Sequence, residues 1–325
     1  MARRIRYDAW PGDRARRVGT DDRSTWTSPW CRPGFVFTEA VASWSSTTPR
    51  GTWIEVAAQA RGHRAWHELG HWSSGTRPTR RTSVTGDPEV DTDVWRPRGA
   101  ADGYRLRVMV HGAATLHRIG AVVSAGEWRG STSAPLHRRE RVLDVPRLSQ
   151  MTYAEVGGRG WCSPASVAMV LSHAGTLPRG TDIPAAARAT FDPAYDGTGN
   201  WSFNTAWAAQ VAGNAFVTRL RDLRDAERFV DAGIPLVASV AYPPGALTRA
   251  PTHGTVGHLV VIRGFTDTAD VVTNDPGAPS DRSVRRTYDR GEFERAWLGG
   301  SGGTVYVIHR DDQPLPPRGR GPSRW

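Results

Sequence analysis

The pattern of apolar and polar positions changes once along the chain, near residue 140. Before that point the apolar runs are short, as at 35–37, 53–56 and 104–110, and clusters of Gly, Pro and Ser separate them. Residues 104–110 alternate apolar and polar side chains, and a period of two is typical of a strand with one buried face. Several such strands between turns predict an all-β sandwich domain over residues 26–135.

The second half of the chain mixes helices and strands. A buried helix is expected after Ser163, because the following residues are apolar on nearly every face. Ser163 as the cap, Pro164 in the first turn and Gly175 just past the end would delimit it. Further helices are expected over 204–211 and 223–232, and strands over 236–240, 258–265, 270–273 and 304–308. This succession predicts an α+β domain over residues 145–310.

Three segments show little apolar periodicity. Residues 1–25 are rich in Arg and Asp, and we expect them to form a flexible arm. Residues 136–144 are expected to be a polar linker between the two domains. Residues 311–325 are rich in Pro, Gly and Arg, and we expect a disordered tail there.

Length and composition favour two soluble domains. The chain has 325 residues, of which 38% are hydrophobic, and a domain usually takes ~150 residues. No run approaches the ~20 consecutive apolar residues that a membrane helix needs, so we expect no membrane span. Two cysteines are too few for a disulfide scaffold or a multi-cysteine zinc site.

The charge argues against nucleic acid as a partner. The formal net charge is +10, and all 42 basic residues are arginines. A nucleic-acid site usually gathers its cations on one element, whereas these arginines are dispersed among acidic residues along the chain. The excess of positive charge therefore indicates little beyond solubility.

Three residues could form a nucleophilic site. Cys162 precedes the predicted buried helix, where free backbone N–H groups stabilise a thiolate. His258 begins one predicted strand and Asp275 ends the next, with a turn near 267–269. An antiparallel hairpin would bring the imidazole and the carboxylate together, as a base and its orienting partner. Asn274 competes for the orienting role, but alternation puts Asn274 and Asp275 on opposite faces, so only one can face His258.

These motifs resemble the papain-like cysteine peptidases. The motifs are SerGln at 149–150, TrpCysSerPro at 161–164, GlyHisLeuValVal at 257–261 and AsnAspPro at 274–276. They are most similar to the bacteriocin-processing (double-glycine) peptidase family 39, in its actinobacterial two-domain form. The resemblance implies that Cys162 is the nucleophile, His258 the general base and Asp275 its partner. It also implies that Gln150 and the Cys162 N–H form the oxyanion hole.

The resemblance implies a thiol peptidase that takes a peptide or protein substrate and needs no cofactor. The chain departs from the family in three ways: it lacks transporter domains, it has CysSerPro where CysGly is common, and its first thirty residues show no apolar signal segment. Localisation therefore stays open. We would expect the chain as written in the cytoplasm, and the family resemblance implies an extracellular place if the start is mis-assigned.

A zinc metalloprotease is one alternative. HisGluLeuGlyHis at 67–71 fits the H-E-x-x-H pattern, in which two histidines bind zinc and the glutamate is the base. The flanking residues favour a strand instead, on which His67 and His71 would share a face but stand ~13 Å apart. A third ligand would come from Glu89, Asp91 or Asp93.

The other alternative is a binding protein whose peptidase-like half is inactive. The N-terminal half is rich in tryptophan, which could stack on the sugars of a glycan or cell-wall ligand, although most tryptophans in a sandwich belong to the core. The tryptophans concerned are Trp26, Trp30, Trp44, Trp53, Trp66, Trp72 and Trp95.

Overall fold

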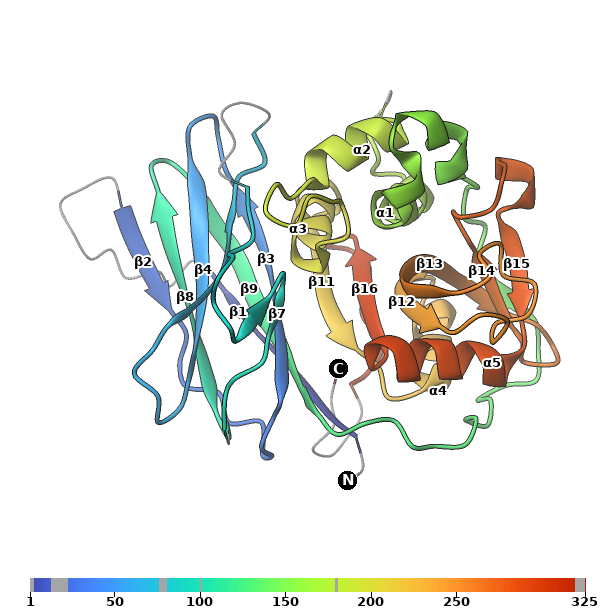
Figure 1. Cartoon of the computed structure of the whole chain (residues 1–325), viewed down its shortest axis with the longest axis horizontal. Coiled ribbons are helices and arrows are strands. Elements are labelled where there is room, and N and C mark those ends of the chain that lie inside the picture. The colour runs from blue at the N-terminus through green and yellow to red at the C-terminus, as the bar shows by residue number, and fades with distance from the viewer. Residues whose placement is uncertain (1–2, 13–22, 76–80, 100, 179–180, 319–324) are drawn as a thin grey trace.

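A computed structural model describes residues 3–12, 23–75, 81–99, 101–178, 181–318 and 325. Two domains follow one another along the chain, and all the strand pairings within them are antiparallel (Figure 1). The predicted fold class, an all-β sandwich followed by an α+β domain, is confirmed.

The N-terminal domain consists of two sheets. One has the order β1 (Arg4–Pro11), β9 (Thr115–Ala125), β3 (Glu39–Thr47), β7 (Val94–Trp95) and β6 (Val90–Asp91). The other has the order β2 (Arg23–Thr27), β8 (Tyr104–His111), β4 (Trp53–Ala60) and β5 (His67–Trp72). Aromatic rings join the two sheets, since Trp10 lies 6.4 Å from both Trp26 and Tyr104 between ring centroids.

The C-terminal domain is built on a seven-stranded sheet. Its order is β11 (Asn214–Arg219), β16 (Thr304–His309), β12 (Leu236–Tyr242), β13 (Thr255–Phe265), β14 (Val271–Asn274) and β15 (Arg285–Tyr288), and β10 (Arg141–Val142) pairs with the end of β13. Each strand predicted in this half is present within a few residues of its expected bounds. The predicted hairpin is β13 and β14, which pair from Val261↔Asn274 to Phe265↔Val271.

Helices cover this sheet. In Figure 1, α1 (Cys162–His173), α2 (Ile183–Thr190) and α3 (Trp201–Ala212) lie above it, and α4 (Leu223–Asp231) and α5 (Arg290–Glu294) lie below. Short turns η1 (Gln150–Val156), η2 (Gly158–Gly160), η3 (Asp281–Ser283) and the π-helical η4 (Arg295–Gly299) complete the domain. In α1, Ser163 through Leu171 are all buried, as the sequence predicts. No helix in the described part of the chain is both long and apolar enough to cross a membrane.

The two domains share a packed interface. Strand β3 is buried along nearly its whole length, and it packs on α3 and β11 of the C-terminal domain. Tyr7 of β1 stacks on Phe216 of β11 with 4.6 Å between ring centroids. The Asp93 carboxylate accepts hydrogen bonds from the backbone N–H groups of Trp201 and Ser202, and so caps α3 from the other domain.

The predictions of a flexible arm over 1–25 and a disordered tail over 311–325 are wrong for the residues that the structure describes. Residues 4–11 form β1, which pairs with β9 along its length. Ile5 and Tyr7 are buried while Arg4 and Arg6, which alternate with them, are less so, and these arginines hide the strand pattern. In the predicted tail, Trp325 is buried with its ring 4.6 Å from that of Phe229. Residues 1–2, 13–22 and 319–324 lie outside the described residues.

Three local expectations also need correction. The linker expected over 136–144 contains β10, a strand of the C-terminal sheet. The run at 35–37 is not a strand, because only Phe37 forms an isolated bridge, to Ala101. Ser163 is not the cap of α1, which begins one residue earlier, at Cys162. The Ser163 hydroxyl instead lies 2.9 Å from that of Tyr306.

The pKa of Asp93 predicts how pH affects stability. Burial raises this pKa to about 7, above the unfolded value of ~3.9. Between these values the folded chain holds a proton that the unfolded chain has lost, so stability should fall as pH rises from 4 to 7. Asp93→Asn keeps the acceptor for α3 and removes this dependence. We expect the variant to exceed the wild type at pH 8 by on the order of 1–3 kcal/mol, and to equal it near pH 4.

Urea unfolding of both proteins at pH 4.5 and pH 8 measures this difference. Asp93→Ala, which removes the acceptor as well as the charge, should be destabilised at both pH values. Identical pH dependence in the wild type and Asp93→Asn would show that Asp93 does not titrate in this range.

Candidate active site

Cys162 is the first residue of α1, on the wall of a cleft of about 990 Å³. The preceding residue, Trp161, makes no side-chain capping hydrogen bond. The first N–H groups of a helix have no intrahelical acceptor and carry partial positive charge. The sulfur also accepts a hydrogen bond from the backbone N–H of Leu259, which helps to lower the pKa of Cys162. The thiol therefore lies where backbone dipoles favour its anion.

The β13–β14 hairpin holds an imidazole and a carboxylate together. His258 Nε2 lies 2.7 Å from Asp275 Oδ1, and both side chains are buried. The other carboxylate oxygen, Oδ2, accepts a hydrogen bond of 2.8 Å from the Tyr288 hydroxyl. The backbone N–H of Gly277 donates to Oδ1 at 3.0 Å. Both carboxylate oxygens of Asp275 are thus held by hydrogen bonds. Because His258 uses Nε2 to bind Asp275, its Nδ1 is left to interact with the Cys162 thiol.

Asn274 faces away from the imidazole. Its Nδ2 donates to the backbone carbonyls of Val145 and Pro146, at 3.3 and 2.8 Å. The alternation of side chains along β14 therefore places Asp275, and not Asn274, beside His258.

The protonation of this group is coupled. Burial alone would raise the pKa of the Cys162 thiol, but the hydrogen bond and charge of His258 outweigh it and the pKa is lowered. Burial alone would lower the pKa of His258, but Asp275 and Cys162 raise it to about 10. Burial likewise opposes the ionised form of Asp275, yet His258 and Tyr288 lower its pKa. Together these shifts favour a thiolate beside an imidazolium.

Gln150 lies at the start of η1 and lines the same cleft as Cys162. Its backbone N–H donates to the carbonyl of Pro276, the residue after Asp275. Its side-chain Nε2 donates to the Arg159 carbonyl at 2.7 Å, which uses one of the two amide hydrogens. Gln150, Cys162 and His258 therefore line one cleft, and Asp275 is buried beside it in contact with His258.

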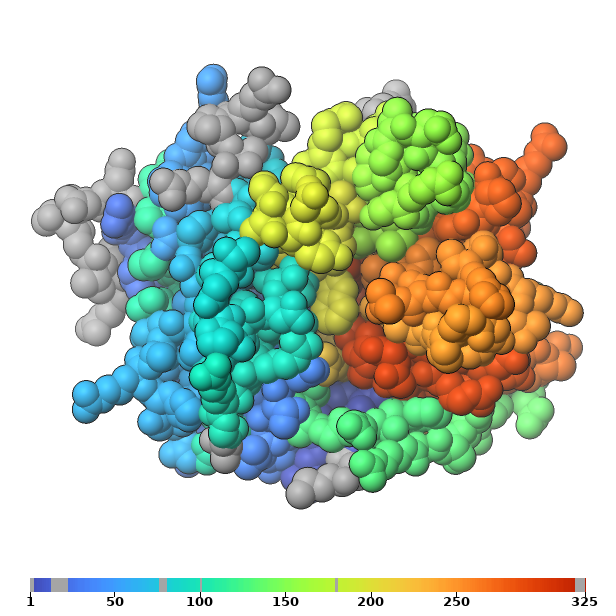
Figure 2. Space-filling view, viewed as in Figure 1, coloured from blue at the N-terminus to red at the C-terminus, as the bar shows by residue number. Residues whose placement is uncertain are grey.

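Both domains build the cleft. The C-terminal domain contributes α1, β13 and the loop from Tyr195 to Gly199, and the N-terminal domain contributes Asp91 to Val94 and Arg96. In Figure 2 the hollow lies where the cyan, yellow and orange segments meet. A substrate at Cys162 would therefore lie against a wall from the sandwich domain.

The HisGluLeuGlyHis motif does not form a metal-binding pair. It lies on β5, as a strand, but a bulge separates the pairs Val56↔Gly70 and Ala57↔Glu68. The extra residue turns His67 and His71 to opposite faces, so the expectation that they share one is wrong. His67 is buried against Trp95, with Nδ1 2.9 Å from Asp87 Oδ2.

His71 lies on the solvent-facing side of the sheet with Glu68 and Glu55. The ligand atoms of these three residues are within 4.8 Å of one another. Each carboxylate there is matched by an imidazole: His71 bonds to Glu68, and His111 Nε2 lies 2.9 Å from Glu55. The zinc-peptidase alternative needs both histidines of the motif on one ion, and it is wrong.

The tryptophans of the sandwich domain are mostly core residues. Trp26, Trp44, Trp72 and Trp95 are buried. Trp30 is 42% exposed, but the guanidinium of Arg105 lies 4.6 Å from its ring centroid and 5.0 Å from that of Trp66. Arg105 therefore covers part of the Trp30 and Trp66 ring surfaces that a sugar would need for stacking. Binding of a glycan stays a prediction.

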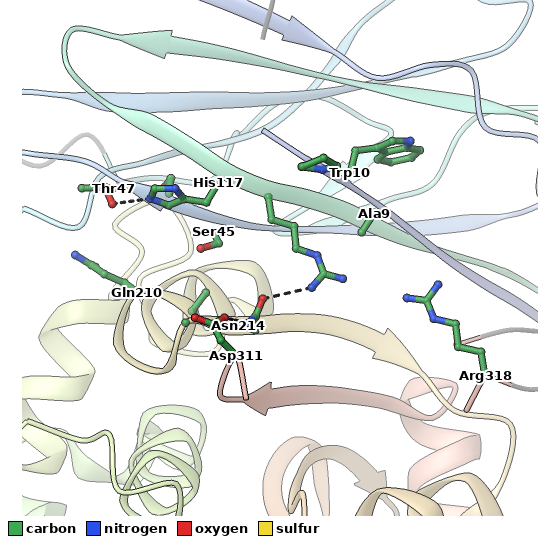
Figure 3. A pocket seen from close by; sticks show the side chains of 14 residues that line it. Ala9, Trp10, Ser45, Thr47, His117, Gln210, Asn214, Asp311 and Arg318 are labelled. Carbon is green, nitrogen blue, oxygen red and sulfur yellow. Dashed lines mark hydrogen bonds between the residues drawn. The ribbon is translucent and has the colours of Figure 1, made fainter. Parts of the chain in front are cut away.

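A second cavity, of about 640 Å³, lies between the domains where β1, β3 and β9 face α3 and β11 (Figure 3). In Figure 3 His117 bonds to Thr47 on the sandwich side, and Asn214 and Asp311 lie on the other side. None of the four predicted site residues lines this cavity.

Two features of the site are missed by the sequence analysis. Tyr288 reaches Asp275 from β15, which the sequence analysis does not predict at all. The Leu259 N–H reaches the sulfur through the pairing of β13, and backbone groups leave no residue-type signal.

Comparison with known proteins agrees with this organisation. Residues 142–304 match the family described as Peptidase_C39 like family, and residues 3–126 match the Peptidase C39 N-terminal domain of actinobacterial type. No curated protein matches the chain. The first match covers half of the chain and includes Cys162, His258 and Asp275, and the chain therefore belongs to the Peptidase C39-like family, in a two-domain form.

Proposed function

We propose that the protein is a cysteine peptidase that hydrolyses amide bonds of a peptide or protein substrate. The observation that carries this proposal is the linked group of Cys162, His258 and Asp275 at the N-terminus of α1. A buried carboxylate that fixes an imidazole, beside a thiol of lowered pKa, is the arrangement that nucleophilic catalysis requires.

In the proposed reaction His258 takes the proton of Cys162, and the thiolate attacks the carbonyl carbon of the substrate. The tetrahedral intermediate expels the amine, which receives its proton from His258, and a thioester to Cys162 remains. His258 then deprotonates a water molecule, which attacks the thioester and releases the carboxylate product and the free thiol. Asp275 keeps the imidazole oriented throughout.

Two donors support an oxyanion hole. As the first residue of α1, Cys162 has a backbone N–H without an intrahelical acceptor. The Gln150 amide has one hydrogen that is not used by Arg159. Preorganised donors of this kind are worth about 2.7–4 kcal/mol each in related acyl-transfer chemistry.

Thiol alkylation tests the ion pair. We expect iodoacetamide to modify Cys162 well below pH ~8.5, the ordinary pKa of a thiol, because His258 lowers the pKa of Cys162. His258→Ala should shift modification to higher pH. Cys31 is the control in the same sample, since burial and Asp8 raise its pKa to about 12. Mass spectrometry measures the alkylation of each cysteine as a function of pH. Equal pH profiles for Cys162 and Cys31 would contradict an activated thiol.

Loss of the sulfur tests the role of the thiol as nucleophile. Cys162→Ala should abolish cleavage of a peptide library, because no other group of the proposed mechanism can form the thioester. Cys31→Ala, at the second free cysteine, should keep it. Turnover retained in Cys162→Ala would overturn the mechanism.

Tyr288→Phe tests the positioning of Asp275. The change removes a hydrogen bond to a buried carboxylate, an interaction worth about 1.5–3 kcal/mol. Without it the pKa of Asp275 should rise, so the acidic limb of the kcat profile should move to higher pH and kcat should fall ~10-fold at neutral pH. An unchanged pH profile would leave Tyr288 with a purely structural role.

A further inference from the structure

The cleft beside Cys162 contains a half-exposed aromatic ring. Tyr195 is 50% exposed and lines the cleft. Two glycines leave room for one edge of this ring: a Cβ on Gly197 would lie 2.7 Å from its Cε1, and a Cβ on Gly199 would lie 3.2 Å from its hydroxyl. The remainder of the exposed ring is open to the cleft.

Several acidic groups lie near this ring. Burial raises the pKa of Tyr195, and nearby negative charges raise it further. The groups that carry these charges are Cys162, Asp93, Asp192 and Asp91. Asp196, the next residue in the chain, also lines the cleft and is exposed. The ring is thus close both to the proposed nucleophile and to acidic groups from the two domains.

The acidic groups have different partners. Asp93 and Asp192 are buried, and their oxygens already accept hydrogen bonds from backbone N–H groups. Asp93 already occupies the N-terminus of α3, which would otherwise favour an anion. Asp91 and Asp196 remain at the surface, where a ligand can reach them.

The cations in this region leave room for a ligand. Asp91 pairs with Arg96 at 3.0 Å, but both side chains are largely exposed and Arg96 is shared with Glu39. Exposed pairs of this kind contribute little stability, so a second cation can replace Arg96. None of the described arginines forms an ion pair with Asp196. Arg159, the other arginine of the cleft, lies on η2 beside Gln150.

We propose that Tyr195, Asp91 and Asp196 form a subsite for a cationic side chain, so that the substrate is a peptide with arginine or lysine near the scissile bond. This inference rests on the proposed peptidase function. A guanidinium or ammonium group would lie against the exposed part of the ring and bind the two carboxylates. Because Asp91 belongs to the sandwich domain, that domain would take part in choosing the substrate.

Peptide binding to the full-length Cys162→Ala variant tests the subsite without turnover. The probes are hexapeptides that carry Arg, Gln or Glu at one position in turn, with Ala and Gly elsewhere. At one position we expect the Arg peptide to bind about tenfold more tightly than the Gln peptide, and the Glu peptide to bind most weakly. Adding Asp91→Asn and Asp196→Asn should bring the Arg-to-Gln ratio near one. Asp267→Asn, at an exposed acid in the β13–β14 turn, should keep the preference.

The same peptides with the wild-type enzyme separate this inference from the proposed function. Cleavage with a preference for Arg that Asp196→Arg turns toward Glu would support both. Cleavage of Arg, Gln and Glu peptides at equal kcat/KM would overturn the subsite and leave the peptidase standing. Selective binding of the Arg peptide without any cleavage would support the subsite and overturn the peptidase.

Discussion

The backbone pairing of β13 is the constraint on which the candidate site depends. Val240↔His258 is one pair of its ladder with β12, and the same strand continues into the ladder with β14 that leads to Asp275. Helix α1 is attached at the next residue, where the Ser166 hydroxyl donates to the Leu259 carbonyl at 3.2 Å. The thiol, the imidazole and the carboxylate are therefore held at their separations by the core of the domain. Groups held in this way need little reorganisation when they react.

Two buried carboxylates hold the loops beside the cleft in place, as β13 holds the reacting groups. Asp93 extends from the sandwich domain to the first turn of α3. Asp192 extends in the opposite direction and accepts the backbone N–H of Ser83, with its second oxygen bound to Asn200. Each joins a loop of one domain to the other next to the cleft. A separation of the domains would break these hydrogen bonds, and the backbone N–H groups of Trp201, Ser202 and Ser83 would lose their acceptors.

The sequence allowed prediction of the local parts of the site and not of the distant ones. Cys162 before an apolar helix and a short hairpin from His258 to Asp275 need only contacts between neighbouring elements, so they could be inferred from punctuation and alternation. The pairing of β1 could not, because β1 pairs with a strand more than a hundred residues away, and long-range pairings leave no local pattern. Tyr288 is only 13 residues from Asp275, but it is missed because β15 is four residues long and buries only one of them, so it has no apolar pattern. The prediction that His67 and His71 share one face is wrong for a local reason. A one-residue bulge reverses every face beyond it, and a bulge has no composition of its own.

The mixed origin of the cleft walls bears on how such chains diversify. If one wall belongs to the sandwich and the others to the peptidase-like half, exchanging the N-terminal half between related chains would also exchange part of the binding surface. The proposed catalytic group would be inherited unchanged, since Cys162, His258 and Asp275 all lie in the C-terminal domain. New selectivity could then arise by recombination at the domain boundary, without any substitution near the sulfur.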